Sequence, residues 1–322
     1  MISVSDSRRA AVIGMDLGGT KLSAALFSHE GEVIRKSEVL LEDKMGSEVG
    51  ALLTEQLLVQ ENFAKESAYH INSIGICVPG ISNQEKGTVW APNIPGWEAY
   101  PLYHELKSEL SRPDLPVSIE SDRNCYILGE MWKGNARNCS NAIFMAIGTG
   151  IGIGIVSNGQ IINGTGGIAG AIGWMALNRP YSREYTSCGQ FEFYASGTGI
   201  ARNAEDLLRQ GAESKLLRAG KITARDVFNA FEKDDPLAVQ ILEQSIEYWG
   251  MAVANLVSLF NPEKIIFGGG VFGPAIRFLD QIYEEASKWA QPISIKQVQL
   301  LGSALGGDAG LIGAGYLAIR NK

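Results

Sequence analysis

Residues 11–26 read AVIGMDLGGTKLSAAL, two apolar runs joined by a glycine turn. The first run, Ala11 to Met15, predicts a buried strand, and the second, Leu22 to Phe27, predicts its antiparallel partner. Gly18 and Gly19 lie between the runs, where residues without a Cβ permit a tight turn. The sequence therefore predicts a β-hairpin at this point of the chain.

The tip of this hairpin carries groups that suit a polyphosphate. Backbone N–H groups of Gly18, Gly19 and Thr20, together with the Lys21 ammonium, can bind phosphate oxygens. Asp16 can hold Mg²⁺ through water, because Mg²⁺ prefers oxygen ligands and keeps part of its hydration shell. A glycine turn between two core strands, with no ligand, explains the hairpin equally well on its own.

A second stretch repeats the pattern. An apolar run from Ala142 to Ile147 is followed by Gly148-Thr149-Gly150 and by a further run from Ile151 to Val156. Two such hairpins can face each other and clamp one polyphosphate. The glycines do not have the G-x-G-x-x-G spacing of a dinucleotide-binding turn, and no Walker A loop occurs in the sequence.

Two further strand ends carry candidate ligands. Val117 to Glu120 predicts a strand that ends at Ser121 and Asp122, at the start of a helix, which is the ligand-facing position of α/β sheets. A helix N-cap is the alternative interpretation of these two residues. A strand from Lys264 to Phe267 runs into Gly268-Gly269-Gly270, where the backbone can approach adenine closely; a plain βα turn is the alternative.

The loop between residues 88 and 97 is rich in Pro, Gly, Asn and Trp, and such long loops are often functional. Asn93 and the tryptophans in it suit the hydroxyls and apolar faces of a sugar. We therefore expect this loop to contact a substrate.

Composition narrows the classes of partner. A chain of 322 residues with 45% hydrophobic residues is long enough for two domains with sizeable cores. The formal charge of −7 argues against nucleic acid or an anionic membrane as the main partner. Its four cysteines form no CxxC pair, which predicts reduced thiols and no thiol metal site. No signal peptide or long apolar span is visible, so we expect a cytoplasmic protein.

Four separated motifs together resemble the ROK family, which comprises repressors, open reading frames and sugar kinases of the actin-like ATPase superfamily. The motifs are Asp16–Lys21, Ser121–Asn124 with Leu128–Glu130, Gly148–Gly152, and Ile266–Gly270. The resemblance implies an α/β fold of two lobes, each with a mixed five-stranded sheet surrounded by helices, and an interdomain cleft. It places the small lobe at residues 1–122 plus about 305–322, and the large lobe at residues 123–304. Homodimers are common in the family.

The resemblance also implies roles for individual residues. Asp122 matches the general base, and Asp16 matches the residue that organises Mg²⁺ around the phosphates of ATP. The phosphate-binding and adenosine-binding loops correspond to Gly18, Gly19, Thr20 and Lys21, to Gly148, Thr149 and Gly150, and to Gly268, Gly269 and Gly270. The candidate sugar ligands are Gly80, Asn93, Ser121, Asp122, Trp174 and Glu192.

The sequence also departs from the family pattern. Ser121 stands where the family usually has Asn. Ala171 and Trp174 stand where it has the Glu and His that touch the C1 and C2 end of the sugar, and that His also binds zinc. The zinc-binding cysteine positions are held by Arg183, Tyr185 and Gln190. With only three histidines in the chain, we predict no structural zinc, and packing of aromatic side chains takes over its bracing role.

We therefore expect an ATP-dependent hexose kinase that phosphorylates a primary hydroxyl, by default glucose at O6. Because the Glu and His ligands are replaced, a sugar modified at C1 or C2, such as an amino, N-acetyl or anhydro sugar, is the alternative substrate. A DNA-binding regulator is a weaker alternative, because the first strand starts by about residue 11 and leaves no room for a helix-turn-helix. A catalytically silent sugar-binding relative is the remaining alternative.

Overall fold

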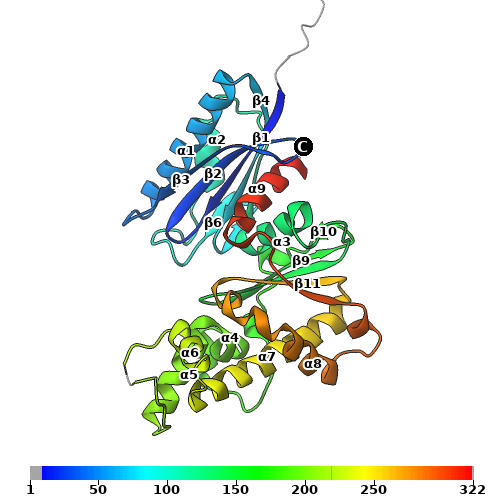
Figure 1. Ribbon diagram of the computed structural model, residues 1–322. Coiled ribbons are helices and arrows are strands. Elements are labelled where there is room, and N and C mark those ends of the chain that lie inside the picture. Colours follow the sequence, from blue (N-terminus) through cyan, green and yellow to red (C-terminus); the bar gives the residue numbers. More distant parts are fainter. Residues whose placement is uncertain (1–8, 219, 321–322) are drawn as a thin grey trace, which may run out of the picture. The chain divides into compact units, whose positions relative to one another are not determined.

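The computed structural model describes residues 9–218 and 220–320, and the expectations for residues 1–8, 219 and 321–322 lie outside the described residues (Figure 1). The chain divides into two compact units. Unit 1 holds the residues up to Arg137, Asn163–Ala169 and the residues from Gly307 onward. Unit 2 holds Asn138–Ile162 and Gly170–Gly306.

Unit 1 is built on a mixed five-stranded sheet with the strand order β3-β2-β1-β4-β7. The predicted hairpin is present, and a third antiparallel strand extends it, while β1, β4 and β7 run parallel. The strands are β1 (Arg9–Leu17), β2 (Lys21–Ser28), β3 (Val33–Leu40), β4 (Tyr69–Val78) and β7 (Val117–Ser121).

Helices cover both faces of this sheet, as the alternation of side chains along β1 requires. Odd-numbered residues of β1 such as Ile13 and Met15 join the core shared with α1 and α2. Even-numbered residues such as Val12 face α9, which is drawn in red in Figure 1. The helices of unit 1 are α1 (Ser47–Glu66), α2 (Leu102–Glu109), α3 (Asp122–Lys133) and α9 (Ala309–Arg320). Asp16 therefore belongs to the α9 face.

Unit 1 extends past residue 122, where the sequence analysis ended the small lobe. The reason is packing: α3 lies along α9, and Cys125 of α3 packs in the core with Ala314 of α9. The contact is so close that a Cβ at Gly313 would overlap the carbonyl oxygen of Cys125.

Replacing Gly313 by alanine is expected to lower the free energy of unfolding by about 1–3 kcal/mol, because overpacking against backbone cannot be relieved by a rotamer change. The urea midpoint measures the effect. Gly307→Ala is the matched control, since a Cβ there meets no atom within 4 Å. Equal midpoints for the two variants would contradict the close packing of α3 on α9.

The loop after Pro79 is more regular than the sequence predicted. It contains a two-stranded hairpin of β5 (Ile81–Asn83) and β6 (Thr88–Trp90). Trp97 is fully buried, stacks on Tyr100 with ring centroids 4.5 Å apart, and donates from Nε1 to the Gly46 carbonyl. Trp97 is thus a core residue, and the expectation that it presents its face to a sugar is wrong.

Unit 2 repeats the sheet topology of unit 1, with the strand order β10-β9-β8-β11-β12. The second predicted hairpin is formed by β8 and β9, and β8, β11 and β12 run parallel. The strands are β8 (Ala142–Ile147), β9 (Ile151–Ser157), β10 (Gln160–Ile161), β11 (Lys264–Gly268) and β12 (Gln299–Gly302). A mixed five-stranded sheet in each unit confirms the predicted fold class.

The helices of unit 2 are α4 (Gln190–Ala195), α5 (Gly197–Arg209), α6 (Ala224–Phe231), α7 (Pro236–Phe260) and α8 (Leu279–Trp289). The side chain of Asp235 caps α7, accepting from the N–H groups of Leu237 and Ala238. A 3₁₀ turn at Pro274–Phe278 precedes α8, and a further 3₁₀ turn at Ser294–Lys296 precedes β12.

Candidate active site

The carboxyl ends of the three parallel strands of unit 1 bring candidate residues together. Asp16 on β1 pairs in register with Cys77 on β4, and Cys77 pairs with Glu120 on β7. Ser121 ends β7 and Asp122 begins α3. Ligands of α/β sheets bind at such strand ends. The fold therefore places two carboxylates that the sequence singled out, those of Asp16 and Asp122, at one edge of one sheet.

Asp122 has the electrostatic properties of a general base. Its Oδ1 accepts from the backbone N–H of Arg123 at 2.8 Å. Burial raises the pKa of Asp122 to about 6; the Arg123 N–H and guanidinium oppose this shift, and the charge of Asp16 adds to it. A carboxylate with such a pKa is ionised at neutral pH and still able to take up a proton.

The capping alternative explains the position of Ser121 and Asp122 but not the Ser121 hydroxyl. Ser121 occupies the N-cap position of α3, but its side chain makes no capping hydrogen bond, and the one first-turn N–H that the Asp122 side chain binds within the described residues is that of Arg123. The Ser121 hydroxyl is buried, with 1% of the residue exposed, and has no hydrogen-bond partner within residues 9–218 and 220–320. A buried hydroxyl without a partner costs stability, so its retention suits a group that binds a ligand.

Glu120, which the sequence analysis missed, fixes this strand–helix junction. Its Oε1 accepts from the Ser121 N–H at 2.8 Å and from the Asn124 amide at 3.1 Å. Its Oε2 accepts from the amides of Asn163 at 3.3 Å and Gln84 at 3.4 Å. Four donors, two of them local and two from the distant residues Gln84 and Asn163, thus hold a buried carboxylate that lacks a cation partner among the described residues. The network sets the backbone from which Ser121 and Asp122 project.

Asp16 lies under the first turn of α9. A Cβ at Gly310 would lie 2.5 Å from Asp16 Oδ2, so only glycine lets the helix pass this carboxyl group. Burial raises the pKa of Asp16, and Asp308 adds to the shift; a hydrogen bond from the Cys77 thiol and the charge of Lys21 oppose it. Asp308, just before α9, is a second carboxylate at this edge that the sequence analysis missed.

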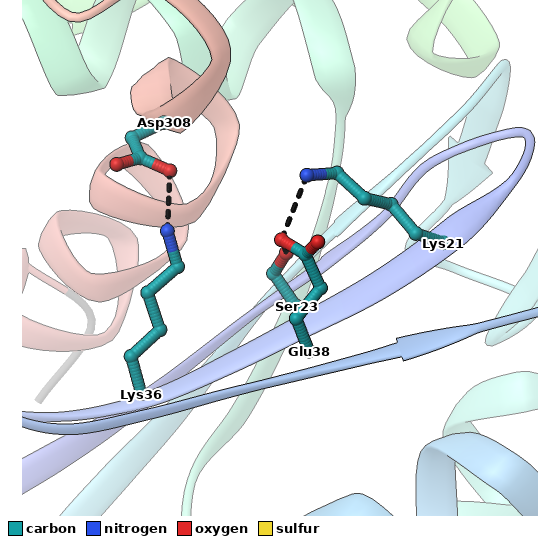
Figure 2. Close-up of polar contacts among 5 residues, drawn as sticks. All are labelled: Lys21, Ser23, Lys36, Glu38 and Asp308. Carbon is teal, nitrogen blue, oxygen red and sulfur yellow. Dashed lines mark hydrogen bonds and ion pairs between the residues drawn. The ribbon is translucent and has the colours of Figure 1, made fainter.

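Lys21 is not free in the structure. Figure 2 shows its ammonium paired with Glu38 at 2.7 Å, while Ser23 donates to the same carboxylate at 3.2 Å. Lys36 pairs with Asp308 at 2.6 Å in the same view. These pairs are exposed, and exposed ion pairs contribute only about 0–1 kcal/mol, so a phosphate can compete for Lys21.

The remaining candidates of unit 1 lie around the first turn. The turn closes by a hydrogen bond from the Gly18 N–H to the Lys21 carbonyl at 2.9 Å. The exposed Asn93 places its amide nitrogen 3.4 Å from the Cβ position of Gly19. Gly80 has φ +92 and lies against the Trp90 carbonyl. Asn93 therefore lies beside the turn of residues 18–21, whereas Gly80 allows the chain to reverse direction into β5.

Unit 2 has a pocket of about 930 Å³ at the carboxyl ends of its parallel strands. Gly148, Thr149 and Gly270 line it, whereas Gly268 is buried against Phe144 and Gly269 packs on the Ile147 carbonyl. The volume lies in the range of small-molecule sites, roughly 300–1,000 Å³. The other wall, which was not predicted from the sequence, is formed by Thr198 and by residues 222–225 and 228–229 around the start of α6.

Glu192 and Trp174, also in unit 2, have different surroundings. Glu192 Oε2 accepts from the Ile151 N–H at 2.6 Å, directly after the Gly148–Gly150 loop. Burial raises the pKa of Glu192, which the hydrogen bond from Ile151 and the charge of Arg202 oppose. Trp174 is 58% exposed. Glu192 therefore braces the loop, and its predicted contact with a sugar stays a prediction.

A magnesium ion fits the Asp16 edge. Within residues 9–218 and 220–320, no three or more His, Cys, Asp or Glu side chains gather in a way that could hold a metal ion by themselves. Mg²⁺ needs no such cage, because one or two carboxylates plus phosphate oxygens and water complete its shell. Asp16 and the nearby Asp308 supply two carboxylates for such a site.

Comparison with known proteins decides the family. The ROK family model matches residues 12–321. The chain belongs to the ROK family. A glucokinase from Halalkalibacterium halodurans is 35% identical over 96% of this chain and 95% of its own. A xylose repressor from Caldicellulosiruptor bescii is 31% identical over 85% of this chain and 69% of its own.

Solved structures confirm the fold of this ROK-family chain. The glucokinase of Streptomyces griseus, in complex with glucose and AMPPNP, is 28% identical, with a TM-score of 0.73 over 96% of this chain and 99% of its own. The α/β fold is therefore of the actin-like ATPase type. No helix in the described part of this ROK-family chain has both the length and the apolarity to cross a membrane. The predicted interdomain cleft stays a prediction.

Proposed function

We propose that this ROK-family protein is an ATP-dependent hexose kinase that transfers the γ-phosphoryl group to a primary hydroxyl, by default O6 of glucose. The observation that carries the proposal is the carboxyl group of Asp122, held at a strand end with a pKa of about 6. The glucokinase relative with 35% identity supports the activity, and the neighbour with bound glucose and AMPPNP supports the pair of substrates.

In this proposal Asp122 accepts the proton of the attacking hydroxyl. General-base catalysis of this kind contributes about 10²- to 10⁴-fold. The unpartnered Ser121 hydroxyl and the exposed Asn93 amide would bind other hydroxyls of the sugar and orient it. Because Glu120 receives four hydrogen bonds, Asp122 projects from a backbone that is already in place before the substrate arrives.

The phosphates would be bound by backbone N–H groups and by side chains of the two glycine loops predicted from the sequence. Residues 18–21 of unit 1 and residues 148–150 of unit 2 are the proposed phosphate loops, and the 930 Å³ pocket of unit 2 takes the nucleoside. Asp16 would hold Mg²⁺, which supplies charge stabilisation to the loose transition state of phosphoryl transfer when bound. The chain's own contribution is to align donor and acceptor and to keep Lys21 beside them.

Two alternative functions are each supported by a specific observation. Ala171 and Trp174 replace the sugar-binding Glu and His of the family pattern, which favours a sugar modified at C1 or C2. The xylose repressor among the relatives supports a sugar-binding protein without catalysis. A homodimer, a cytoplasmic location and the absence of structural zinc remain predictions.

Release of ADP by the purified protein, with MgATP and a panel of hexoses, amino sugars, N-acetyl sugars and anhydro sugars, tests the proposal. Turnover that depends on one sugar supports a kinase and names its acceptor. Binding of a sugar in calorimetry without any sugar-dependent turnover would instead favour the silent relative.

The pH profile gives an independent prediction. The base acts in its ionised form, so kcat/KM is expected to be constant above pH 7 and to fall about tenfold per pH unit below the pKa of about 6. Steady-state rates between pH 4.5 and 8.5 at saturating MgATP measure this. If kcat/KM instead falls around pH 4, the pKa of the Asp122 carboxyl group is not raised by its surroundings.

A further inference from the structure

Unit 1 has a second concave site, which we call the charged pocket, at the amino end of β4. The candidate residues Asp16 and Asp122 lie at the carboxyl ends of the parallel strands, at the opposite edge of the same sheet. The volume of the charged pocket is about 330 Å³, within the range of roughly 300–1,000 Å³ for small-molecule sites. Its walls include Leu58, Glu61 and Lys65 of α1, Tyr69 and Ile71 of β4, and Arg112 after α2.

The guanidinium of Arg112 is a fixed cation in this pocket. Its Nη2 donates to the Ile71 carbonyl, and its Nη1 donates to Nε2 of His70 at 3.3 Å. Both acceptors are neutral, because arginine can only donate and an imidazole that accepts carries no charge. The two contacts therefore orient Arg112, while its positive charge has no ion pair among the described residues.

The carboxylate of Glu61 is half-buried on the α1 side of the charged pocket. Burial raises the pKa of Glu61, and the charge of Arg112 and a hydrogen bond with Ser111 oppose this shift without cancelling it. Within residues 9–218 and 220–320, Glu61 forms no ion pair. A cationic group bound beside it would stabilise the carboxylate.

The third charged group, Lys65, lies one helical turn after Glu61 on α1. A glutamate and a lysine four residues apart attract each other on a helix, yet Lys65 is exposed and forms no ion pair in the described part of the chain. The charged pocket thus presents two positive groups and one negative group that are not paired with each other. The apolar side chains of Leu58 and Ile71 lie beside them.

We propose that the charged pocket binds a free α-amino acid with an aliphatic side chain. The carboxylate of the ligand would bind Arg112 and Lys65, its ammonium group would bind Glu61, and its side chain would pack on Leu58 and Ile71. Each charge of the ligand then meets a group of opposite sign, and its apolar surface leaves water. A ligand with only a negative charge would lie unfavourably close to Glu61, and one with only a positive charge would lie unfavourably close to Arg112.

Calorimetry on the full chain, without nucleotide or sugar, tests the proposal with three probes of one carbon skeleton. Leucine carries both charges, 4-methylpentanoate lacks the ammonium group, and 3-methylbutylamine lacks the carboxylate. We expect leucine to bind, and each of the other two probes to bind about ten- to a hundredfold more weakly. That factor is the effect of leaving one charged group without its hydrogen-bonding partner.

Variants on α1 assign the ligand's charges to side chains. Glu61→Gln should weaken leucine binding about tenfold and leave 4-methylpentanoate binding unchanged or tighter. Lys65→Met should weaken binding of both probes about two- to fivefold, because an exposed ion pair contributes less. Glu55→Gln is the matched control, since it alters an exposed carboxylate of α1 outside the pocket and should bind leucine as the wild type does. Urea midpoints show whether each variant is folded.

Three results would each overturn the proposal. The first is that neither leucine nor valine binds at millimolar concentration. The second is that 4-methylpentanoate or inorganic phosphate binds as tightly as leucine, which would make the pocket a site for simple anions. The third is that Glu61→Gln binds leucine as the wild type does, which would place the amino acid elsewhere. Because the assay contains neither nucleotide nor sugar, each of these results leaves the proposed kinase function standing.

Discussion

Replacing Asp122 by asparagine is expected to lower kcat for sugar phosphorylation by about 10²- to 10⁴-fold, the range of general-base catalysis. The asparagine fills the same space and can still accept from the Arg123 N–H. Binding of sugar and nucleotide should therefore change little, so the loss appears in kcat rather than in KM. ADP release and calorimetry on the same preparation separate the two.

The same substitution is expected to stabilise the protein. Burial raises the pKa of Asp122 from its ordinary value of 3.8 to about 6 in the folded chain, so folding favours the protonated carboxyl. The contribution of this carboxyl group to stability is therefore greatest below pH 4 and is lost as the pH rises through 6. At pH 7 the asparagine variant should gain up to about 3 kcal/mol in free energy of unfolding, and below pH 4 the gain should vanish.

The control for both measurements is Asp114→Asn, which alters an exposed carboxylate of the same unit. It should leave kcat and the urea midpoint as in the wild type. If Asp122→Asn keeps more than a tenth of the wild-type kcat, another group takes the proton. If it loses stability at pH 7, the Asp122 carboxylate is not destabilised by its burial.

The elements that the sequence predicted well are those whose residues interact with near neighbours in the chain. The two hairpins follow from apolar runs around residues 18–19 and 148–150, because alternation and turn chemistry are local. Short elements such as α4 were missed because six residues do not establish a period.

The contacts that complete the candidate site join segments that are far apart in sequence. Glu120 accepts hydrogen bonds from Gln84, Asn124 and Asn163, and no local sequence pattern predicts this set of partners. Trp97 lies in a loop whose composition is typical of sugar-binding loops. Its side chain is nevertheless buried, and its indole N–H donates to the Gly46 carbonyl. Glu192 is a predicted sugar ligand whose Oε2 accepts from the Ile151 N–H, a hydrogen bond that the sequence did not predict. In each case the type of residue is evident from the sequence, but its hydrogen-bond partner could not be predicted from the sequence.

Replacing Asp16 by asparagine is expected to lower kcat by about 10²- to 10³-fold, the usual effect of removing one group that stabilises transition-state charge. It should differ from Asp122→Asn in one respect. Without its base the enzyme can still hydrolyse MgATP slowly with water as acceptor, whereas without the Asp16 carboxylate both sugar phosphorylation and this background hydrolysis should fall. ADP release with and without sugar, over a range of Mg²⁺ concentrations, measures the difference.

Stability gives the second readout for Asp16. Burial raises the pKa of Asp16, so its ionised form opposes folding at neutral pH, and the asparagine variant should unfold at a higher urea concentration at pH 7. A variant at Asp16 that gains stability and loses activity would show that the buried carboxylate under α9 serves function at a cost in stability. A variant that loses stability would mean that the hydrogen bond with Cys77 outweighs the cost of burial. A variant that keeps its activity would remove Asp16 from the proposed magnesium site and leave Asp308 as the carboxylate to test next.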